Sequence, residues 1–425
     1  MPEIPVTLAR IRRAHERLAG SIRHTPLLHS DRFSEMAGCD VYLKAEYQQV
    51  TGSFKIRGAL TKMAALTPAQ RRRGVVAASM GNHAQGVAHA ATRSGIRSTI
   101  VMPLSAPLAK YKATQGYGAE VRLFGDSLEE CVAEARRIER ETGATFVHAY
   151  DDWDIITGQG TLALEILADL PEADALVVPV GGGGLIAGMA LAARALRPDI
   201  RLIGVQALGC AAFPAALAAG APIPLASANT IADGIRVKQP GEKTFPIVRD
   251  LVDEVVTVDD DAISRTIVQL VERRKLVVEG AGATGLAALL YGRHRLPRAA
   301  RAVAVLSGGN IDVALMGRIL NYGLAASGRL LTVEVTVPDT PNQLARLLTT
   351  CGDRGANITQ VDHARGELAI QVGYTAIRIT METRDAPHQA EIRAALAAGG
   401  WPVRQLAPAP ALDAAANADE EPGGG

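Results

Sequence analysis

Short apolar runs alternate with helical patterns over most of the chain, from Val41 to Asn310. Each run ends in a Gly-marked turn, and stretches with apolar residues three or four positions apart follow. This alternation predicts buried parallel strands joined by crossover helices, an α/β architecture, and the number of runs favours two sheets over one. The runs are VYLKA (41–45), GVVAAS (74–79), STIVMP (98–103), AEVRLF (119–124), ALVVPV (175–180), RLIGVQA (201–207) and AVAVLSGG (302–309).

The pattern changes after Gly328, where LLTVEVTV (330–337) alternates between apolar and polar positions as a half-buried strand does. Four further elements and a short last strand near Val403 complete the order βαββαβ, which is typical of a ferredoxin-like unit. The four elements are a helix (343–355), two strands (357–361 and 369–382) and a second helix (386–400).

These changes in pattern predict the domain boundaries. The last stretch, rich in Ala, Pro, Gly and acidic residues, cannot bury enough apolar surface to order itself, so we expect a disordered tail. We expect an α/β unit at 1–325 with a small subdomain at about 41–150 inserted in a large one, a linker at 326–330, a βαββαβ unit at 331–406 and the tail at 407–425.

The charge balance argues against several classes of partner. Lys plus Arg number 45 and Asp plus Glu number 44, so no electrostatic attraction to nucleic acid or to an anionic membrane is expected. The first 20 residues read as an amphipathic helix without the apolar core of a signal peptide, and no apolar run is long enough to span a bilayer. A small-molecule substrate is the remaining expectation.

The four cysteines, Cys39, Cys131, Cys210 and Cys351, lie far apart and form no CxxC pair. A disulfide framework or a zinc site is therefore not expected, and a reducing cytoplasm fits this cysteine usage best.

Four short segments lie where a predicted strand ends and a helix begins, the edge at which open α/β sheets bind ligands. They are TGSFKIRG (51–58), SMGNHAQG (79–86), GGGG (181–184) and SGGN (307–310). Lys55, near the start of a predicted helix in an apolar neighbourhood, is favoured as a neutral, nucleophilic amine by desolvation and by the positive helix end. Taken alone, an exposed surface lysine is the commoner case.

The other three segments carry backbone N–H groups suited to anions. Four consecutive glycines, Gly181 to Gly184, let the backbone wrap around a phosphate, although a flexible linker has the same composition. The turn at 79–86 suits a carboxylate or phosphate, with an ordinary N-cap turn as the alternative. The turn at 307–310 is equally compatible with an anion site and a plain strand–helix turn.

Together, a candidate Schiff-base lysine, a phosphate loop and two polar turns match what pyridoxal 5′-phosphate (PLP) requires. In their order and spacing, GSFKIRGA, SMGNHAQGVA, the four glycines and SGGN resemble the threonine dehydratase branch of the fold-type II PLP enzymes, whose catalytic unit is similar to the tryptophan synthase β fold. HTPL, TIADGIRV and VVEGAGA extend the likeness from Ile22 to Asn321. The C-terminal unit resembles an ACT domain through DTPNQLARLL and RGANITQVDHAR, as in threonine ammonia-lyases with one ACT module.

The resemblance implies roles for individual residues. Lys55 is implied to carry the cofactor as a Schiff base and to move the Cα proton, with Ser307 facing the pyridine nitrogen. The implied cofactor-binding residues are Phe54, Lys55, Asn82, Gly181, Gly182, Gly183, Gly184, Leu185 and Ser307, and the implied substrate-carboxylate turn is Ser79, Met80, Gly81, Asn82 and His83.

Two positions depart from related serine racemases. Met80 stands where those enzymes carry a Ser implied to act as an acid–base, so racemase activity is not expected. Gln206 stands where their divalent-metal site is implied to begin with Glu, and a neutral amide is a weak ligand for a hard cation. We therefore expect no metal.

The implied reaction is the deaminating dehydration of L-threonine, and also of L-serine, to a 2-oxo acid and ammonia. A dehydratase for another hydroxy-amino acid such as 3-hydroxyaspartate, and a non-catalytic amino-acid sensor, remain alternatives. The ACT-like unit implies isoleucine or valine as effector in isoleucine biosynthesis, and a homodimer or homotetramer is expected.

Overall fold

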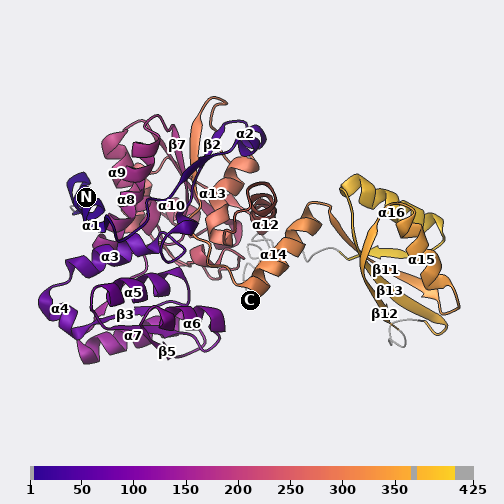
Figure 1. Cartoon of the computed structure of the whole chain (residues 1–425), viewed down its shortest axis with the longest axis horizontal. Helices are drawn as coiled ribbons and strands as arrows, with labels where there is room; N and C mark the ends of the chain where they lie inside the picture. The colour runs from indigo at the N-terminus through magenta and orange to yellow at the C-terminus, as the bar shows by residue number, and fades with distance from the viewer. Residues whose placement is uncertain (1–3, 365–370, 407–425) are drawn as a thin grey trace, which may run out of the picture.

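The computed structural model of the chain describes residues 4–364 and 371–406, so the predicted tail at 407–425 lies outside them. The described residues form two parallel-type sheets and one antiparallel sheet (Figure 1). None of the helices in these ranges combines the length and the apolarity that a membrane span requires.

The large sheet has six strands in the order β1-β2-β10-β7-β8-β9, and only β1 runs antiparallel to its neighbour. Its strands are β1 (Leu27–His29), β2 (Asp40–Lys44), β7 (Ala175–Pro179), β8 (Arg201–Ala207), β9 (Glu254–Val258) and β10 (Arg301–Val305). Helices cover both faces, so the central strands are buried except at the first residues of β8 and β10, as their continuous apolar runs predicted.

One face of the large sheet packs on α1 (Leu8–Leu18), α8 (Trp153–Asp169), α9 (Gly184–Leu196), α10 (Ala212–Ala219) and α11 (Thr244–Leu251). The other face packs on α2 (Asp31–Ala37), α12 (Asp260–Gln269), α13 (Gly280–Leu290) and α14 (Val313–Ala326). Short helical turns complete this part at η1 (Glu46–Gln48), η2 (Leu208–Cys210), η3 (Asp233–Ile235) and η4 (Leu270–Arg274).

The small sheet has four parallel strands in the order β5-β4-β3-β6. They are β3 (Val75–Ala78), β4 (Ser98–Met102), β5 (Glu120–Leu123) and β6 (Thr145–Phe146), with helices α3 (Lys55–Ala65), α4 (Pro68–Arg73), α5 (Asn82–Arg93), α6 (Leu108–Gly116) and α7 (Leu128–Thr142) around them. The prediction of two α/β sheets is confirmed. However, β2, which the sequence placed at the start of the small subdomain, pairs with β10 in the large sheet.

The C-terminal unit has the predicted βαββαβ order and an antiparallel sheet, β12-β13-β11-β14. Its elements are β11 (Leu330–Pro338), α15 (Gln343–Gly352), β12 (Asn357–Ala364), β13 (Tyr374–Glu382), α16 (Ala386–Ala398) and β14 (Val403–Gln405). Alternate residues of β11 are buried under the helices, as the sequence pattern indicated. The unit lies beyond α14, away from the two α/β sheets (Figure 1).

Helix α3 joins the two α/β parts, because it packs against α5 on one side and α8 on the other. The contact with α8 is so close that a Cβ atom on Gly158 would lie 2.5 Å from the Arg57 carbonyl oxygen. Only glycine fits at such a backbone approach.

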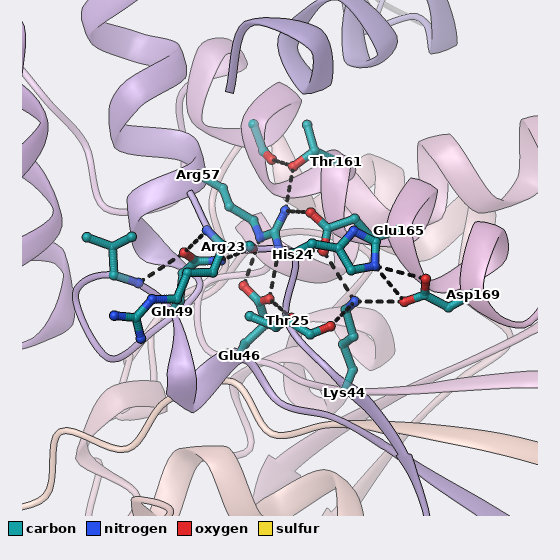
Figure 2. Close-up of polar contacts among 12 residues, drawn as sticks. Arg23, His24, Thr25, Lys44, Glu46, Gln49, Arg57, Thr161, Glu165 and Asp169 are labelled. Carbon is teal, nitrogen blue, oxygen red and sulfur yellow. Dashed lines mark hydrogen bonds and ion pairs between the residues drawn. The ribbon is translucent and has the colours of Figure 1, made fainter. Parts of the chain in front are cut away.

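A network of buried charges fixes this contact (Figure 2). The Arg57 guanidinium, on α3, donates to both oxygens of Glu46 at 2.8 Å and to Glu165 on α8 at 2.7 and 2.9 Å. Lys44, at the end of β2, lies 3.2 Å from Glu165 and 3.2 Å from Asp169. Thr25 donates to Glu46 at 2.5 Å, so the carboxylates have several donors each.

The side chains of Arg57, Lys44 and Glu46 have no exposed surface, and that of Glu165 is 2 % exposed. Removing a buried charge leaves its partners unpaired in a low-dielectric interior, which is more damaging than losing one hydrogen bond. The network therefore ties α3 to β2 and α8, which belong to the large α/β part.

We predict that Arg57→Met destabilises the α/β part of the chain by about 3–5 kcal/mol, because Glu46 and Glu165 lose their shared cation. Urea unfolding followed by circular dichroism measures the effect. Arg12→Met is the matched control, because Arg12 is exposed and has no ion pair within the described ranges, and its effect is expected within about 0.5 kcal/mol. A loss below about 1 kcal/mol for Arg57→Met would contradict the assigned role.

Candidate active site

Two of the predicted segments lie side by side at the strand ends. Ser53 forms a β-bridge with Gly308, and the Gly309 N–H donates to the Gly52 carbonyl at 2.9 Å. The Phe54 N–H donates to the Ser307 carbonyl at 3.1 Å. The SGGN turn therefore holds the residues that immediately precede Lys55.

Lys55 is the first residue of α3, at the helix end expected from sequence. Its amine donates to the Ala149 carbonyl at 3.0 Å and lies 5.2 Å from the Phe54 ring centre. Burial lowers the Lys55 pKa to about 8, and the nearby Glu279 carboxylate opposes this shift only in part. At a pKa of about 8 the amine is still mostly protonated at pH 7, but its neutral, nucleophilic fraction is far larger than that of an exposed lysine.

Asn82, the first residue of α5, connects two other segments. Its side-chain amide donates to Glu279 at 2.6 Å, and its carbonyl oxygen accepts from Asn310 at 2.7 Å. Asn310 also donates to the Thr51 carbonyl at 2.7 Å. The turns at 51–55, 79–83 and 307–310 are therefore connected by side-chain hydrogen bonds.

Glu279 belongs to this cluster, although no role for it was predicted from the sequence. It is 4 % exposed, and burial, followed by the charge of Asp233, raises its pKa to about 7. Asp233 itself pairs with Lys110 of α6 at 2.6 Å. The only sequence signal was the position of Glu279 after Val277-Val278 and before a glycine-rich helix, within VVEGAGA.

The glycine loop follows β7 and opens α9. The backbone N–H groups of residues 181–185 have no hydrogen-bond acceptor among the described residues, whereas the Gly182 carbonyl accepts from Thr244 at 2.6 Å. Position 182 has no room for a side chain, since a Cβ on Gly182 would lie 2.3 Å from the Tyr150 ring. Position 183 favours glycine for another reason, because its φ is +96°. A row of free N–H donors at a helix start is a preformed anion site.

Tyr150 places the glycine loop near Lys55, because Tyr150 follows Ala149, whose carbonyl accepts the lysine amine. Leu185, also predicted to contact cofactor, is the second residue of α9 and is buried. Sequence reasoning did not identify Tyr150, since nothing in residues 148–151 resembles a motif.

The remaining predicted residues have distinct surroundings. The Ser307 hydroxyl makes no hydrogen bond in the described part of the chain, and Ser79 accepts from the Gly81 N–H at 3.1 Å. Burial lowers the His83 pKa to about 3, and its ring contacts the Val147 carbonyl at 2.9 Å, so the imidazole is neutral. Met80 lies in the same turn and is partly exposed.

Gln206 supports the glycine loop. Its amide donates to the Val180 carbonyl at 3.2 Å, and its oxygen accepts from the Phe213 N–H at 2.8 Å. Residues 4–364 and 371–406 contain no group of three or more His, Cys, Asp or Glu side chains that could hold a metal ion.

The residues present fit PLP. The unpaired N–H groups at 181–185 suit a phosphate, and a desolvated lysine suits an aldehyde. Thr51 and Ser53, on the lysine segment, have buried hydroxyls with no partner in the described chain, as expected where a bound group would complete the hydrogen bonding.

Comparison with known proteins agrees with this chemistry. Residues 18–308 match the family model described as pyridoxal-phosphate dependent enzyme. An L-threonine ammonia-lyase of Thermotoga maritima is 46 % identical over 400 residues, which cover 94 % of this chain and 99 % of that protein. A catabolic L-threonine dehydratase of Escherichia coli K12 is 44 % identical over 321 residues, covering 75 % of this chain and 98 % of that protein.

Solved structures give the same result for the catalytic part. A threonine deaminase from T.th. superposes with a TM-score of 0.68 and 41 % identity, covering 72 % of this chain and 99 % of that one. Maize serine racemase superposes with a TM-score of 0.71 and 39 % identity, covering 74 % and 96 %. The chain belongs to the family of pyridoxal-phosphate-dependent enzymes, in the branch that contains the threonine ammonia-lyases.

Proposed function

We propose that this protein is an L-threonine ammonia-lyase that converts L-threonine, and more slowly L-serine, to a 2-oxo acid and ammonia. The observation that carries the proposal is Lys55, a half-buried lysine at the start of α3 whose pKa is lowered to about 8, beside a loop of unpaired N–H groups. The identity of 46 % to an L-threonine ammonia-lyase over 94 % of the chain supports the substrate.

Bound PLP supplies the aldehyde that takes up the substrate amine and the ring that withdraws electrons from Cα. The N–H groups at 181–185 would hold its phosphate, and Phe54, whose ring lies next to the Lys55 amine, would pack beside the cofactor ring. The neutral Lys55 amine accepts the Cα proton. The turn from Ser79 to His83 receives the substrate carboxylate through backbone N–H groups at the start of α5.

Asn82 and Ser307 orient the cofactor in this proposal. Asn82 is held between Glu279 and Asn310, so its amide is fixed where a phenolic oxygen could join the network. The Ser307 hydroxyl is neutral and does not enforce a proton on a pyridine nitrogen. A carboxylate would do so, and the weaker electron withdrawal favours elimination over racemisation.

Two alternatives make different predictions. A dehydratase for another hydroxy-amino acid would share every residue above and differ in substrate preference. A non-catalytic sensor would need no lysine with a lowered pKa. Met80 has no ionisable hydrogen on its side chain, so it supports elimination rather than racemisation, despite the structural likeness to maize serine racemase.

We predict that L-threonine gives the highest kcat/KM in a 2-oxo acid assay of the holoenzyme over L-threonine, L-serine and 3-hydroxyaspartate. D-threonine serves as the stereochemical control. A higher kcat/KM for 3-hydroxyaspartate would replace the proposed substrate, and no 2-oxo acid from any of the three would favour the sensor.

We also predict that Lys55→Ala abolishes turnover and the visible imine absorbance, because the side chain would no longer offer an amine to the cofactor aldehyde. Lys112→Ala is the control, since Lys112 is an exposed lysine of α6 and both signals should persist. Activity that survived Lys55→Ala at the level of the control would exclude Lys55 as the catalytic amine.

The C-terminal unit carries none of the catalytic segments, and we propose that it binds isoleucine or valine as an effector. The region at 339–346, where β11 leads into α15, is the proposed ligand contact in a paired unit of a homodimer or homotetramer. A purely structural role in dimerisation is the alternative. The four cysteines are free and buried, which supports the proposed cytoplasmic location.

We predict that a chain truncated after Gly328 keeps its activity but loses the effect of isoleucine and valine on the dependence of rate on threonine. The Escherichia coli relative aligns over 98 % of its own length with only 75 % of this chain. This supports an α/β part that is active without the C-terminal unit. If isoleucine and valine affected the truncated and full chains equally, the effector site would lie outside the C-terminal unit. If they affected neither chain, the C-terminal unit would have only a structural role.

A further inference from the structure

A hollow of about 510 Å³ lies outside the catalytic cluster, between α1, α3, α5 and the start of α8. Four arginines line it: Arg10, Arg13 and Arg17 from α1, and Arg93 from the end of α5. Thr61 and Ser94 contribute hydroxyl groups, and Leu18 and Leu60 contribute apolar surface. None of these residues takes part in the chemistry described above.

The arginines that line this hollow outnumber the carboxylates that could neutralise them. Arg10 pairs with Asp154 at 2.6 Å, but Asp154 also pairs with Lys62 at 3.2 Å. Arg13 and Arg17 make no ion pair in the described chain, and Arg93 donates to the Gly20 carbonyl at 3.4 Å rather than to a carboxylate. The whole chain has a formal net charge of only +1, so this excess of cations is local.

The spacing of the arginines adds to the imbalance. Arg10, Arg13 and Arg17 are three and four residues apart, so they share one face of α1, where like charges destabilise a helix. An anion bound among them would relieve that repulsion. Guanidinium groups are suited to this task, since they bind phosphate and carboxylate oxygens with paired N–H donors and remain charged.

We propose that this hollow is a binding site for a small organic polyanion carrying phosphate or carboxylate groups. Its volume lies within the range of about 300–1,000 Å³ typical of small-molecule sites and exceeds what a single inorganic ion fills. The arginines take the charged groups, the Ser94 hydroxyl adds a hydrogen bond, and the apolar wall accommodates the carbon skeleton.

The site is connected to the catalytic cluster by three helices. Helix α3 begins at Lys55 and carries Leu60 and Thr61, while α5 begins at Asn82 and ends at Arg93. Asp154, at the start of α8, follows Ala149 and Tyr150 by a few residues. A ligand therefore contacts the same rigid helices that position the lysine and Asn82, which gives it a route to alter substrate binding.

The test uses the full-length holoenzyme, so that the cofactor phosphate already occupies the glycine loop. Isothermal titration calorimetry at fixed low ionic strength measures the binding of inorganic pyrophosphate and, in a separate arm, of citrate. Binding of pyrophosphate alone identifies a phosphate ligand, and binding of citrate alone identifies a carboxylate ligand. Absence of binding of both to the wild-type protein at millimolar concentration overturns the proposal.

The double variant Arg13→Ala/Arg17→Ala should weaken binding at least tenfold. The control Arg12→Ala/Arg72→Ala removes the same charge from two exposed arginines that do not line the hollow, and it should bind as the wild type does. Equal weakening in both doubles would show non-specific attraction and reject the site. If only the Arg13→Ala/Arg17→Ala variant changed its sedimentation coefficient, this face would be a subunit interface. That result would also reject the proposed binding site. Unchanged circular dichroism and cofactor absorbance verify that both variants fold.

Discussion

The buried ion pairs of Arg57 with Glu46 and Glu165 fix the position of α3 against the large α/β part (Figure 2). A buried charge is stable only when ion-pair and hydrogen-bond partners replace water. The three side chains can therefore occupy only a narrow range of relative positions. Arg57 lies two residues beyond Lys55 on α3, and Glu165 lies on α8 of the large α/β part. The network thus sets where α3 begins relative to β2 and α8, and with it the position of the catalytic amine.

The second requirement is a set of donors that remain unpaired. The N–H groups of the glycine loop have no acceptor among the described residues, although the Gly182 carbonyl accepts from Thr244, and Tyr150 packs so closely against the loop that only glycine fits at position 182. The lysine begins α3 and the glycine loop follows β7, far away in the chain, and the segment at 149–150 contacts both. A cofactor-dependent lyase needs a fixed catalytic lysine, which the rigid contact between α3 and α8 provides. It also needs unpaired N–H groups, since a bound cofactor completes their hydrogen bonding.

The elements that could be predicted from the sequence were those with a clear local pattern of apolar or turn residues. Continuous apolar runs identified β3, β4, β7, β8 and β10, and strand-to-helix turns located the starts of α3 and α5. Strands β6, with two residues, and β9, which is only half buried, carry too weak a pattern to stand out. The assignment of β2 to the small subdomain failed because its pairing with β10, from the far end of the catalytic part, has no local signature.

The polar contacts escaped prediction for the same reason. Glu46, Arg57 and Glu165 are separated in the chain, and each alone looks like a surface charge. Glu279 shows its character only through burial and the Asn82 amide. We assign the cofactor to Lys55, one of the eight lysines in the chain. Borohydride reduction of the holoenzyme, followed by peptide mapping by mass spectrometry, tests it most directly. We expect a pyridoxyl label on Lys55, and a label on Lys44, Lys110 or any other lysine would exclude this assignment.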